Sequence, residues 1–274
     1  MRKTISILGT TFFLVTICLA AHADIVPGAV FYLDARDNPT HPDAWTNLAE
    51  DGGSIPPMAL KPALEEGPIK IPDIGFNERK TKYYTSRKSA EMYGTQAWNP
   101  PLSLDDWTIE FLVRRNGDLF REEHQLLGIN TLPEGRQGFR LGIRGGDTLG
   151  IGIYHGNADM GIASNVRLEE GVWNWVALTG EDKKEILVYQ NGKRVSQQAG
   201  VDFDKKIPLR VITIGSFSPG EKNRNFNGSF ALIRVYDKAL SQNELEQNIN
   251  AWSGLAVQPD SKLAITWGML KASR

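Results

Sequence analysis

The chain has 274 residues and a formal net charge of −1, from 31 basic and 32 acidic residues. The charges are scattered as on a solvated surface, and no basic run is interleaved with aromatic residues, which argues against nucleic acid as a partner. The single cysteine, Cys18, excludes a disulfide framework within the chain.

Residues 1–23 have the pattern of a signal peptide. A basic start at residues 2–3 precedes an uncharged apolar run at 5–19, and Ala-His-Ala at 21–23 supplies the small residues that a signal peptidase needs. We therefore expect cleavage before Asp24 and a secreted, periplasmic or cell-surface protein. The apolar run is shorter than the roughly 20 residues that span a bilayer. No later stretch is apolar enough to span one, so we expect no transmembrane segment in the mature chain.

Cleavage would leave 29 basic against 32 acidic residues, a net charge of −3, and would remove Cys18. The remaining chain of about 250 residues suits one large all-β domain better than two small ones. We place this domain at residues 24–254 and a C-terminal tail at 255–274.

Short β-strands dominate the expected domain. In the clearest, 107–113, every second residue from Trp107 to Val113 should lie on one face. Residues 35–68, rich in Pro, Gly, Asp and Asn, should form a long loop with at most short strand pieces. The other expected strands are Ala29 to Leu33, Gln125 to Ile129, Gly138 to Arg144, Leu149 to Tyr154, Trp173 to Thr179, Ile186 to Gln190, Lys193 to Gln198, Arg210 to Gly215 and Phe230 to Tyr236. So many short strands, with no helical run before Ser241, predict an antiparallel β-sandwich.

Asn191-Gly192 is the strongest hairpin signal in the chain. A type I′ turn needs positive φ at both central residues, which Asn and Gly tolerate. We expect this dipeptide to join the strands at 186–190 and 193–198.

The end of the domain predicts a strand followed by a short helix. Four strand residues should alternate on one side: Phe230, Leu232, Arg234 and Tyr236. Ser241 and Glu244 form a capping box, in which each side chain accepts from the backbone amide of the other. An apolar stripe follows on the helix at Leu245, Ile249 and Trp252.

Three blocks in this order carry a family resemblance. Residues 104–114 hold an aromatic-Thr-Ile-Glu-aromatic strand, 173–192 hold two strands ending in Tyr-Gln-Asn-Gly, and 228–240 hold the closing strand. Together they resemble the laminin-G-like, concanavalin A-like lectin/glucanase jelly-roll family, in its bacterial exported form. The resemblance implies a jelly-roll β-sandwich with one short C-terminal helix.

Many members of that family read Gly-Xaa-Ile-Asp-Glu in the last strand, where the aspartate helps to bind a structural calcium ion. Here the matching position is Ala231, which has no side-chain oxygen, whereas Ca²⁺ takes 6–8 oxygen ligands. This departure argues against the usual calcium site. Four residues after the first strand are candidate calcium ligands: Asp34, Asp37, Asn38 and Asp43. Alternatively, they favour turns because their side chains bond their own backbone.

An enzyme of the same fold is an alternative function. Glycoside hydrolysis needs two carboxylates about 5–10 Å apart. The Glu-Xaa-Asp-Xaa-Xaa-Glu run of jelly-roll hydrolases is missing, and Glu110 stands alone on its strand. A lyase would need an Arg, His and Tyr set. Arg121, His124 and Gln125 come close in type, but their spacing matches no pattern known to us.

Exported jelly rolls often bind glycans through exposed aromatic rings. The candidate ligand-binding residues are concentrated in one region: Tyr83, Tyr84, Tyr93 and Trp98. Alternatively, the tyrosines pack the sheet edges, and Trp173 is expected in the core. We expect a non-catalytic binding module for a glycan or an extracellular protein. A glycan-cleaving enzyme and a structural or adhesion module of the cell envelope remain alternatives.

Overall fold

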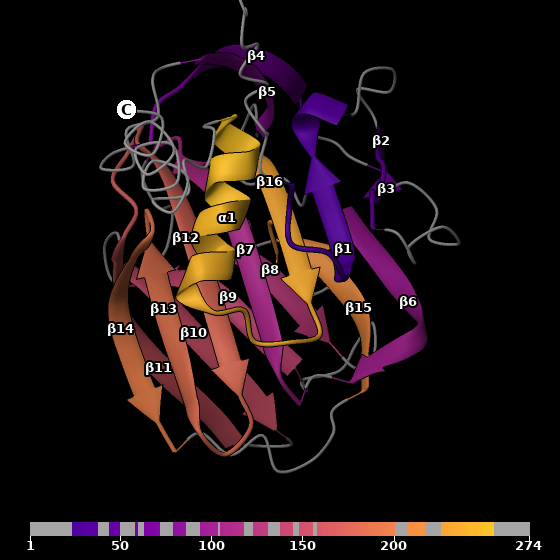
Figure 1. The fold of residues 1–274 in the computed structure, drawn as a ribbon, viewed down its shortest axis with the longest axis vertical. Helices are drawn as coiled ribbons and strands as arrows, with labels where there is room; N and C mark the ends of the chain where they lie inside the picture. The colour runs from indigo at the N-terminus through magenta and orange to yellow at the C-terminus, as the bar shows by residue number, and fades with distance from the viewer. Residues whose placement is uncertain are drawn as a thin grey trace, which may run out of the picture.

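The computed structural model describes residues 24–37, 44–49, 58–59, 63–71, 79–85, 94–103, 105–117, 123–130, 138–144, 148–155, 158–200, 208–216 and 226–254. Two antiparallel sheets stack face to face, and one α-helix crosses the outside of the larger sheet (Figure 1). The predicted all-β sandwich with a C-terminal helix is therefore confirmed. Over the described ranges, no helix has the length and apolar character needed to span a bilayer.

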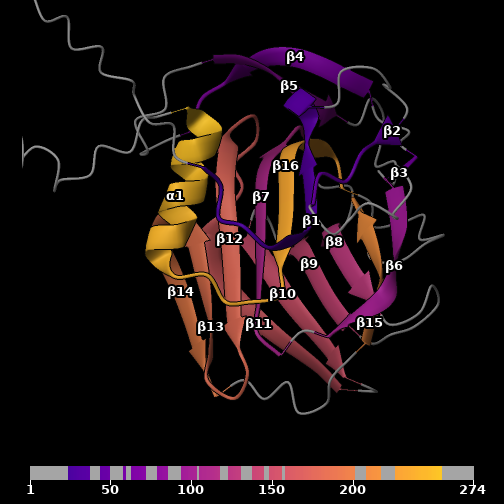
Figure 2. The ribbon, with the colours of Figure 1, turned by 45° about the vertical axis from the view of Figure 1, so that its right-hand side comes forward.

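The larger sheet has eight strands, and β1 pairs with its central strand β16. The path runs β14 (Lys193–Ala199), β13 (Glu185–Gln190), β12 (Trp173–Glu181), β7 (Trp107–Arg115), β16 (Gly228–Tyr236), β5 (Arg79–Thr85) and β4 (Ala63–Ile69), with β1 (Ala29–Asp34) beside β16. Figure 2 shows β4 and β5 arching over one end of the sandwich.

The smaller sheet has six strands and lies behind the first in Figure 1. Its order is β11 (Ala158–Arg167), β10 (Thr148–His155), β9 (Gly138–Arg144), β8 (Glu123–Asn130), β15 (Pro208–Ile214) and β6 (Gly94–Ser103). The short strands β2 (Ala44–Trp45) and β3 (Met58–Ala59) pair with each other, and a 3-10 turn, η1 (Ala35–Asp37), follows β1.

The core lies between the two sheets. The alternation predicted for β7 is confirmed, because its inward residues share one buried cluster: Trp107, Ile109, Phe111 and Val113. The opposite sheet contributes Leu127, Leu141, Ile143, Ile212 and Ile214 to the same cluster. Burial of such a continuous apolar layer is the main force that holds the sheets together.

Helix α1 (Gln242–Ser253) forms a third layer on the outer face of the eight-stranded sheet. The predicted capping box is present, with Ser241 N donating to Glu244 Oε2 at 2.8 Å and Ser241 Oγ accepting from Glu244 N. The predicted stripe is buried: Leu245, Ile249 and Trp252. Trp252 meets Trp175 of β12 edge to face at 6.0 Å between ring centroids.

The alternation predicted for β16 is wrong at its start. The pairing of β16 with β7 shifts between Phe230 and Leu232, which marks a β-bulge. Phe230 therefore packs between the sheets with Ile233 and Val235. Leu232 and Tyr236 belong to the clusters on the helix side. One inserted residue thus moves Phe230 to the opposite face from the one that strict alternation assigns.

The predicted hairpin at Asn191-Gly192 is confirmed. Asn191 has φ 52° and Gly192 has φ 80°, and Gln190 pairs with Lys193 across the turn. Asn191 Oδ1 also accepts from the backbone N–H of Trp175 at 2.9 Å, which ties the turn to β12.

Four strands were not predicted: β4, β5, β6 and β11. Most of β4 falls within residues 35–68, where a loop with at most short strand pieces was expected, and all seven of its residues pair with β5. The sequence of β5, Arg-Lys-Thr-Lys-Tyr-Tyr-Thr, is strongly charged, and β6 contains Pro100 and Pro101. Proline is accepted on an edge strand, and β6 lies at an edge of the six-stranded sheet, as does β11.

Candidate functional site

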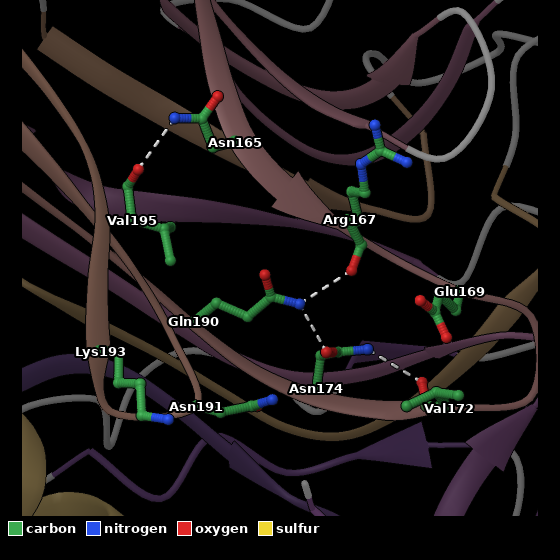
Figure 3. A pocket seen from close by; sticks show the side chains of 9 residues that line it. All are labelled: Asn165, Arg167, Glu169, Val172, Asn174, Gln190, Asn191, Lys193 and Val195. Atoms are coloured by element: carbon green, nitrogen blue, oxygen red, sulfur yellow. Dashed lines mark hydrogen bonds between the residues drawn. The ribbon is translucent and has the colours of Figure 1, made fainter. Parts of the chain in front are cut away.

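A cleft of about 370 Å³ opens at the side of the sandwich, and Figure 3 shows the side chains that line it. It lies where β11, an edge strand of the smaller sheet, meets the β13–β14 hairpin at an edge of the larger sheet. Most of the described residues that line it have polar or charged side chains, and two are valines: Asn165, Arg167, Glu169, Val172, Asn174, Gln190, Asn191, Lys193 and Val195.

Backbone contacts hold the two walls of the cleft in place. Asn165 bridges the sheet edges, because its N–H donates to Ser196 Oγ at 2.8 Å and its Nδ2 donates to Val195 O at 3.1 Å. The turn after β11 is fixed by Gly171, which has φ 76° and donates its N–H to Arg115 O at 2.8 Å. The hairpin turn at Asn191 fixes the other wall.

The floor of the cleft is a row of oriented amides. Gln190 Nε2 donates both to the backbone carbonyl of Arg167 at 2.8 Å and to Asn174 Oδ1 at 2.7 Å. Asn174 Nδ2 in turn donates to Val172 O at 3.1 Å (Figure 3). These bonds use both ends of the Asn174 amide but only the nitrogen of Gln190. Within the described ranges, Gln190 Oε1 and Asn165 Oδ1 accept no hydrogen bond.

The charged side chains of the cleft lie at its rim. Arg167, Glu169 and Lys193 are exposed. Figure 3 shows the guanidinium of Arg167 directed away from the carboxylate of Glu169. Neither forms an ion pair with a described residue. Among the described residues that line the cleft, Glu169 is the only carboxylic acid, whereas a glycosidase uses two.

The candidate aromatic residues lie elsewhere. Tyr84 is fully buried, with its ring centroid 4.4 Å from that of Trp45. Tyr83 is 7% exposed, and its ring packs edge-on against Trp173 at 5.2 Å. Such buried rings present no face on which a sugar could stack. Their burial favours the alternative in which the tyrosines pack the sheets, and it is consistent with the expected burial of Trp173.

The guanidinium of Arg114 reinforces that packing, because it lies 4.9 Å from the ring centroid of Tyr83 and 5.0 Å from that of Trp173. The other two candidate aromatics lie in part outside the described residues. The backbone of Trp98 belongs to β6, but its side chain and the whole of Tyr93 are not described.

The proposed calcium loop is only partly described. Both carboxylate oxygens of Asp34 are bound by Arg36, with Nη2 to Oδ2 at 2.6 Å and Nε to Oδ1 at 3.0 Å. The side chain of Asp37, and Asn38 and Asp43, lie outside the described residues. In the part of the chain that is described, no group of three or more His, Cys, Asp or Glu side chains is arranged to hold a metal ion.

Glu110 is part of a buried ion pair under helix α1, a role that sequence reasoning missed. Its Oε2 lies 3.3 Å from Arg234 Nη1, both side chains are fully buried, and Asn248 Nδ2 donates to Oε1 at 3.0 Å. Burial raises the pKa of Glu110 above its ordinary range, against the opposing effect of the Arg234 guanidinium. The sequence signal for this ion pair was a single charged residue in the middle of each of two apolar strands: Glu110 in β7 and Arg234 in β16.

The suggested lyase set is only partly described. Arg121 and the side chain of His124 lie outside the described residues. Gln125 is buried on β8, and its amide makes no hydrogen bond to a described group.

A second hollow, of about 470 Å³, lies between residues 24–29, residues 48–49 and helix α1. Most of its described lining residues are aliphatic or small, and its walls are already joined by Gln247 Nε2 donating to Asp24 O at 2.7 Å. Three of them have polar side chains, Asp24, Tyr32 and Gln247, against seven in the edge cleft.

Comparison with known proteins supports the fold independently. A profile described as the concanavalin A-like lectin/glucanases superfamily matches residues 92–246, more than half of the chain. A comparison with curated protein sequences finds no match.

Several solved structures have a similar fold. The receptor-binding domain of botulinum neurotoxin mosaic serotype C/D has a TM-score of 0.54 at 15% identity, covering 82% of this chain and 50% of that chain. Trypanosoma rangeli sialidase has a TM-score of 0.54 at 12% identity, covering 84% of this chain and 34% of that chain.

A structure from work on botulinum neurotoxin type C has a TM-score of 0.51 at 12% identity, covering 82% of this chain and 51% of that chain. Cell entry of that toxin depends on interaction with two ganglioside molecules. This chain thus spans about half the length of the toxin structures it matches. At such identities the similarity shows the fold alone.

Proposed function

Because the chain belongs to the concanavalin A-like lectin/glucanase superfamily, we propose that it is an exported, non-catalytic module that binds a glycan in the edge cleft. The observation that carries this proposal is that two amide side chains of the cleft are ordered and have a free oxygen. Asn165 and Gln190 are held by hydrogen bonds through one end, and each has an oxygen left to accept from a ligand.

Fixed amides suit sugar recognition for a physical reason. Sugar hydroxyls need both donors and acceptors, and a side chain that is already ordered loses little entropy when the ligand binds. The cleft volume of about 370 Å³ lies within the range of small-molecule sites. The ganglioside interaction of the type C toxin gives a precedent among proteins of similar fold.

The same residues support two other functions less well. A glycan-cleaving enzyme would need a second carboxylate in the cleft, and Glu169 has no acidic partner among the described lining residues. In a purely structural module, Asn165 and Gln190 would only protect the strand edges. This second reading predicts the same hydrogen bonds, so a binding experiment must separate the two.

A glycan array probed with the mature protein, with and without calcium, tests the proposal. We expect binding to at least one glycan, weakened about threefold to tenfold by Asn165→Ala or Gln190→Ala, because each removes one hydrogen bond to the ligand. Gln198→Ala is the matched control, since this exposed amide on β14 does not line the cleft. Melting curves should show all three variants folded.

The absence of binding to any glycan under both conditions would refute the proposed function. Binding that survives both cleft substitutions would place the glycan site elsewhere on the molecule.

A further inference from the structure

We infer that the edge cleft selects a sugar that carries a carboxylate, such as a uronic or sialic acid, over its neutral counterpart. This inference rests on the proposed function and names the ligand class of the same cleft. Three features lead to it: the charges at the rim, the absence of aromatic rings among the described lining residues, and the hydrogen bond that ties the backbone of Arg167 to Gln190.

The rim carries a positive charge at Arg167, whose exposed guanidinium forms no ion pair with a described residue. Lys193 adds a second cation to the lining and Glu169 one anion, whereas the whole chain has a net charge of −1. A positive site on a weakly acidic protein attracts anions locally without attracting polyanions over the whole surface.

The lining offers polar contacts but no ring for stacking. None of the described residues that line the cleft is aromatic, and its apolar contacts come from Val172 and Val195. A neutral polysaccharide face held by stacking would find no partner among them. The described lining therefore offers hydrogen bonds and charge in place of ring stacking, and hydrogen bonds to an ionised group are about twice as strong as neutral ones.

Arg167 and Gln190 are joined through the backbone. Gln190 Nε2 donates to the backbone carbonyl of Arg167 at 2.8 Å, and Figure 3 shows the guanidinium directed away from the Gln190 amide. To bind the same ligand as Gln190 Oε1, the exposed side chain of Arg167 must turn back over the cleft. A guanidinium binds a planar carboxylate through two parallel N–H···O bonds. Gln190 Oε1 can then accept from a neighbouring hydroxyl. A carboxylate with a hydroxyl a few atoms away is the arrangement found in sugar acids.

Glu169 should change the affinity for an anionic ligand in the opposite direction to Arg167. Its carboxylate lines the same cleft as Arg167 and has no cationic partner among the described residues. It therefore repels an anionic ligand while accepting from hydroxyl groups. Removing its charge should strengthen the binding of an acidic sugar, the opposite of the effect of removing the charge of Arg167.

Calorimetry of the mature protein with matched ligand pairs tests this: sialyllactose against lactose, and oligogalacturonate against oligogalactose. We expect the acidic member of at least one pair to bind about tenfold more tightly than the neutral member, as one charge-assisted hydrogen bond allows. Arg167→Gln should abolish that preference and Glu169→Gln should increase it. Arg194→Gln removes the same charge from an exposed β14 position outside the cleft and should change the affinity less than twofold.

The outcomes separate this inference from the proposed function. Equal binding of both members of every pair, or equal effects of Arg167→Gln and Arg194→Gln, would overturn the inference and leave glycan binding standing. No binding of any sugar would refute both. Poly-glutamate or dextran sulfate binding as tightly as the acidic sugars would also overturn it, because a surface that accepts any polyanion selects no sugar.

Discussion

Replacing Arg234 by methionine should strongly destabilise the fold, because it leaves the Glu110 carboxylate buried and unpaired. Both side chains are fully buried, and the ion pair spans 3.3 Å between Oε2 and Nη1. After the replacement, Asn248 Nδ2, at 3.0 Å from Oε1, is the remaining described side-chain donor to the carboxylate. Breaking a buried ion pair by removing one partner costs about 3–5 kcal/mol, and we expect a loss of that size.

The double variant Glu110→Leu with Arg234→Met should recover most of that loss. It buries two apolar side chains of similar size in place of two charges, and Asn248 Nδ2 keeps a hydrogen bond to Tyr236 Oη at 3.1 Å. Arg234 Nε has no partner among the described groups, which already reduces the net benefit of the native pair. We expect the double variant to lie within about 1 kcal/mol of the native protein.

Urea unfolding of the mature protein at pH 7, followed by tryptophan fluorescence, measures these differences. A loss below about 1 kcal/mol for Arg234→Met would refute the reasoning, as would a double variant at least as unstable as the single one.

The pH dependence of the unfolding free energy is a further check. The folded-state pKa of Glu110 is raised, so the folded state holds this proton more tightly than the unfolded state. Lowering the pH therefore stabilises the fold through this group, and the deficit of Arg234→Met should shrink as the pH falls.

Three further predictions concern local structure. Gly192→Val should lower the free energy of urea unfolding by at least about 1 kcal/mol, because a β-branched residue resists the φ of 80°. Lys193→Val, at the next position, should change it little. Equal effects of the two substitutions would contradict the turn assignment. Ser241→Ala should cost about 1 kcal/mol by loss of the helix cap, and an unchanged unfolding midpoint would contradict it. The Ser241 amide lowers the pKa of Glu244 by donating to its carboxylate. The native protein should therefore have a higher free energy of unfolding than Glu244→Gln at neutral pH, and this difference should shrink as the pH falls through the lowered pKa.

Local features of the fold could be predicted from sequence because short-range chemistry determines them. Asn191-Gly192 and the Ser241–Glu244 capping box each depend on residues at most three positions apart. The β-bulge at Phe230 could not be predicted in this way, because it appears only when β16 pairs with β7 more than a hundred residues away. The alternation of residues alone assigned Phe230 to the wrong face.

The candidate site was harder to predict than the fold. Aromatic composition drew attention to Tyr83 and Tyr84, but whether a tyrosine faces solvent depends on what covers its strand. The edge cleft combines the end of β11 with the β13–β14 hairpin, and its amides are ordinary Asn and Gln residues. The hydrogen bonds between the two elements, from Gln190 Nε2 to the carbonyl of Arg167 and from Asn165 to Val195 and Ser196, show that they form one surface.

The position of β16 has a consequence for the order of folding. This strand is the last of the chain's described strands, yet it pairs with β1, β5 and β7 at the centre of the eight-stranded sheet. A ribosome must therefore synthesise about 236 of the 274 residues before that sheet can close. Pairings of such long range also form slowly. A nascent chain that cannot complete its sheet stays open for most of its synthesis, which is the state that an export signal at residues 1–23 would require.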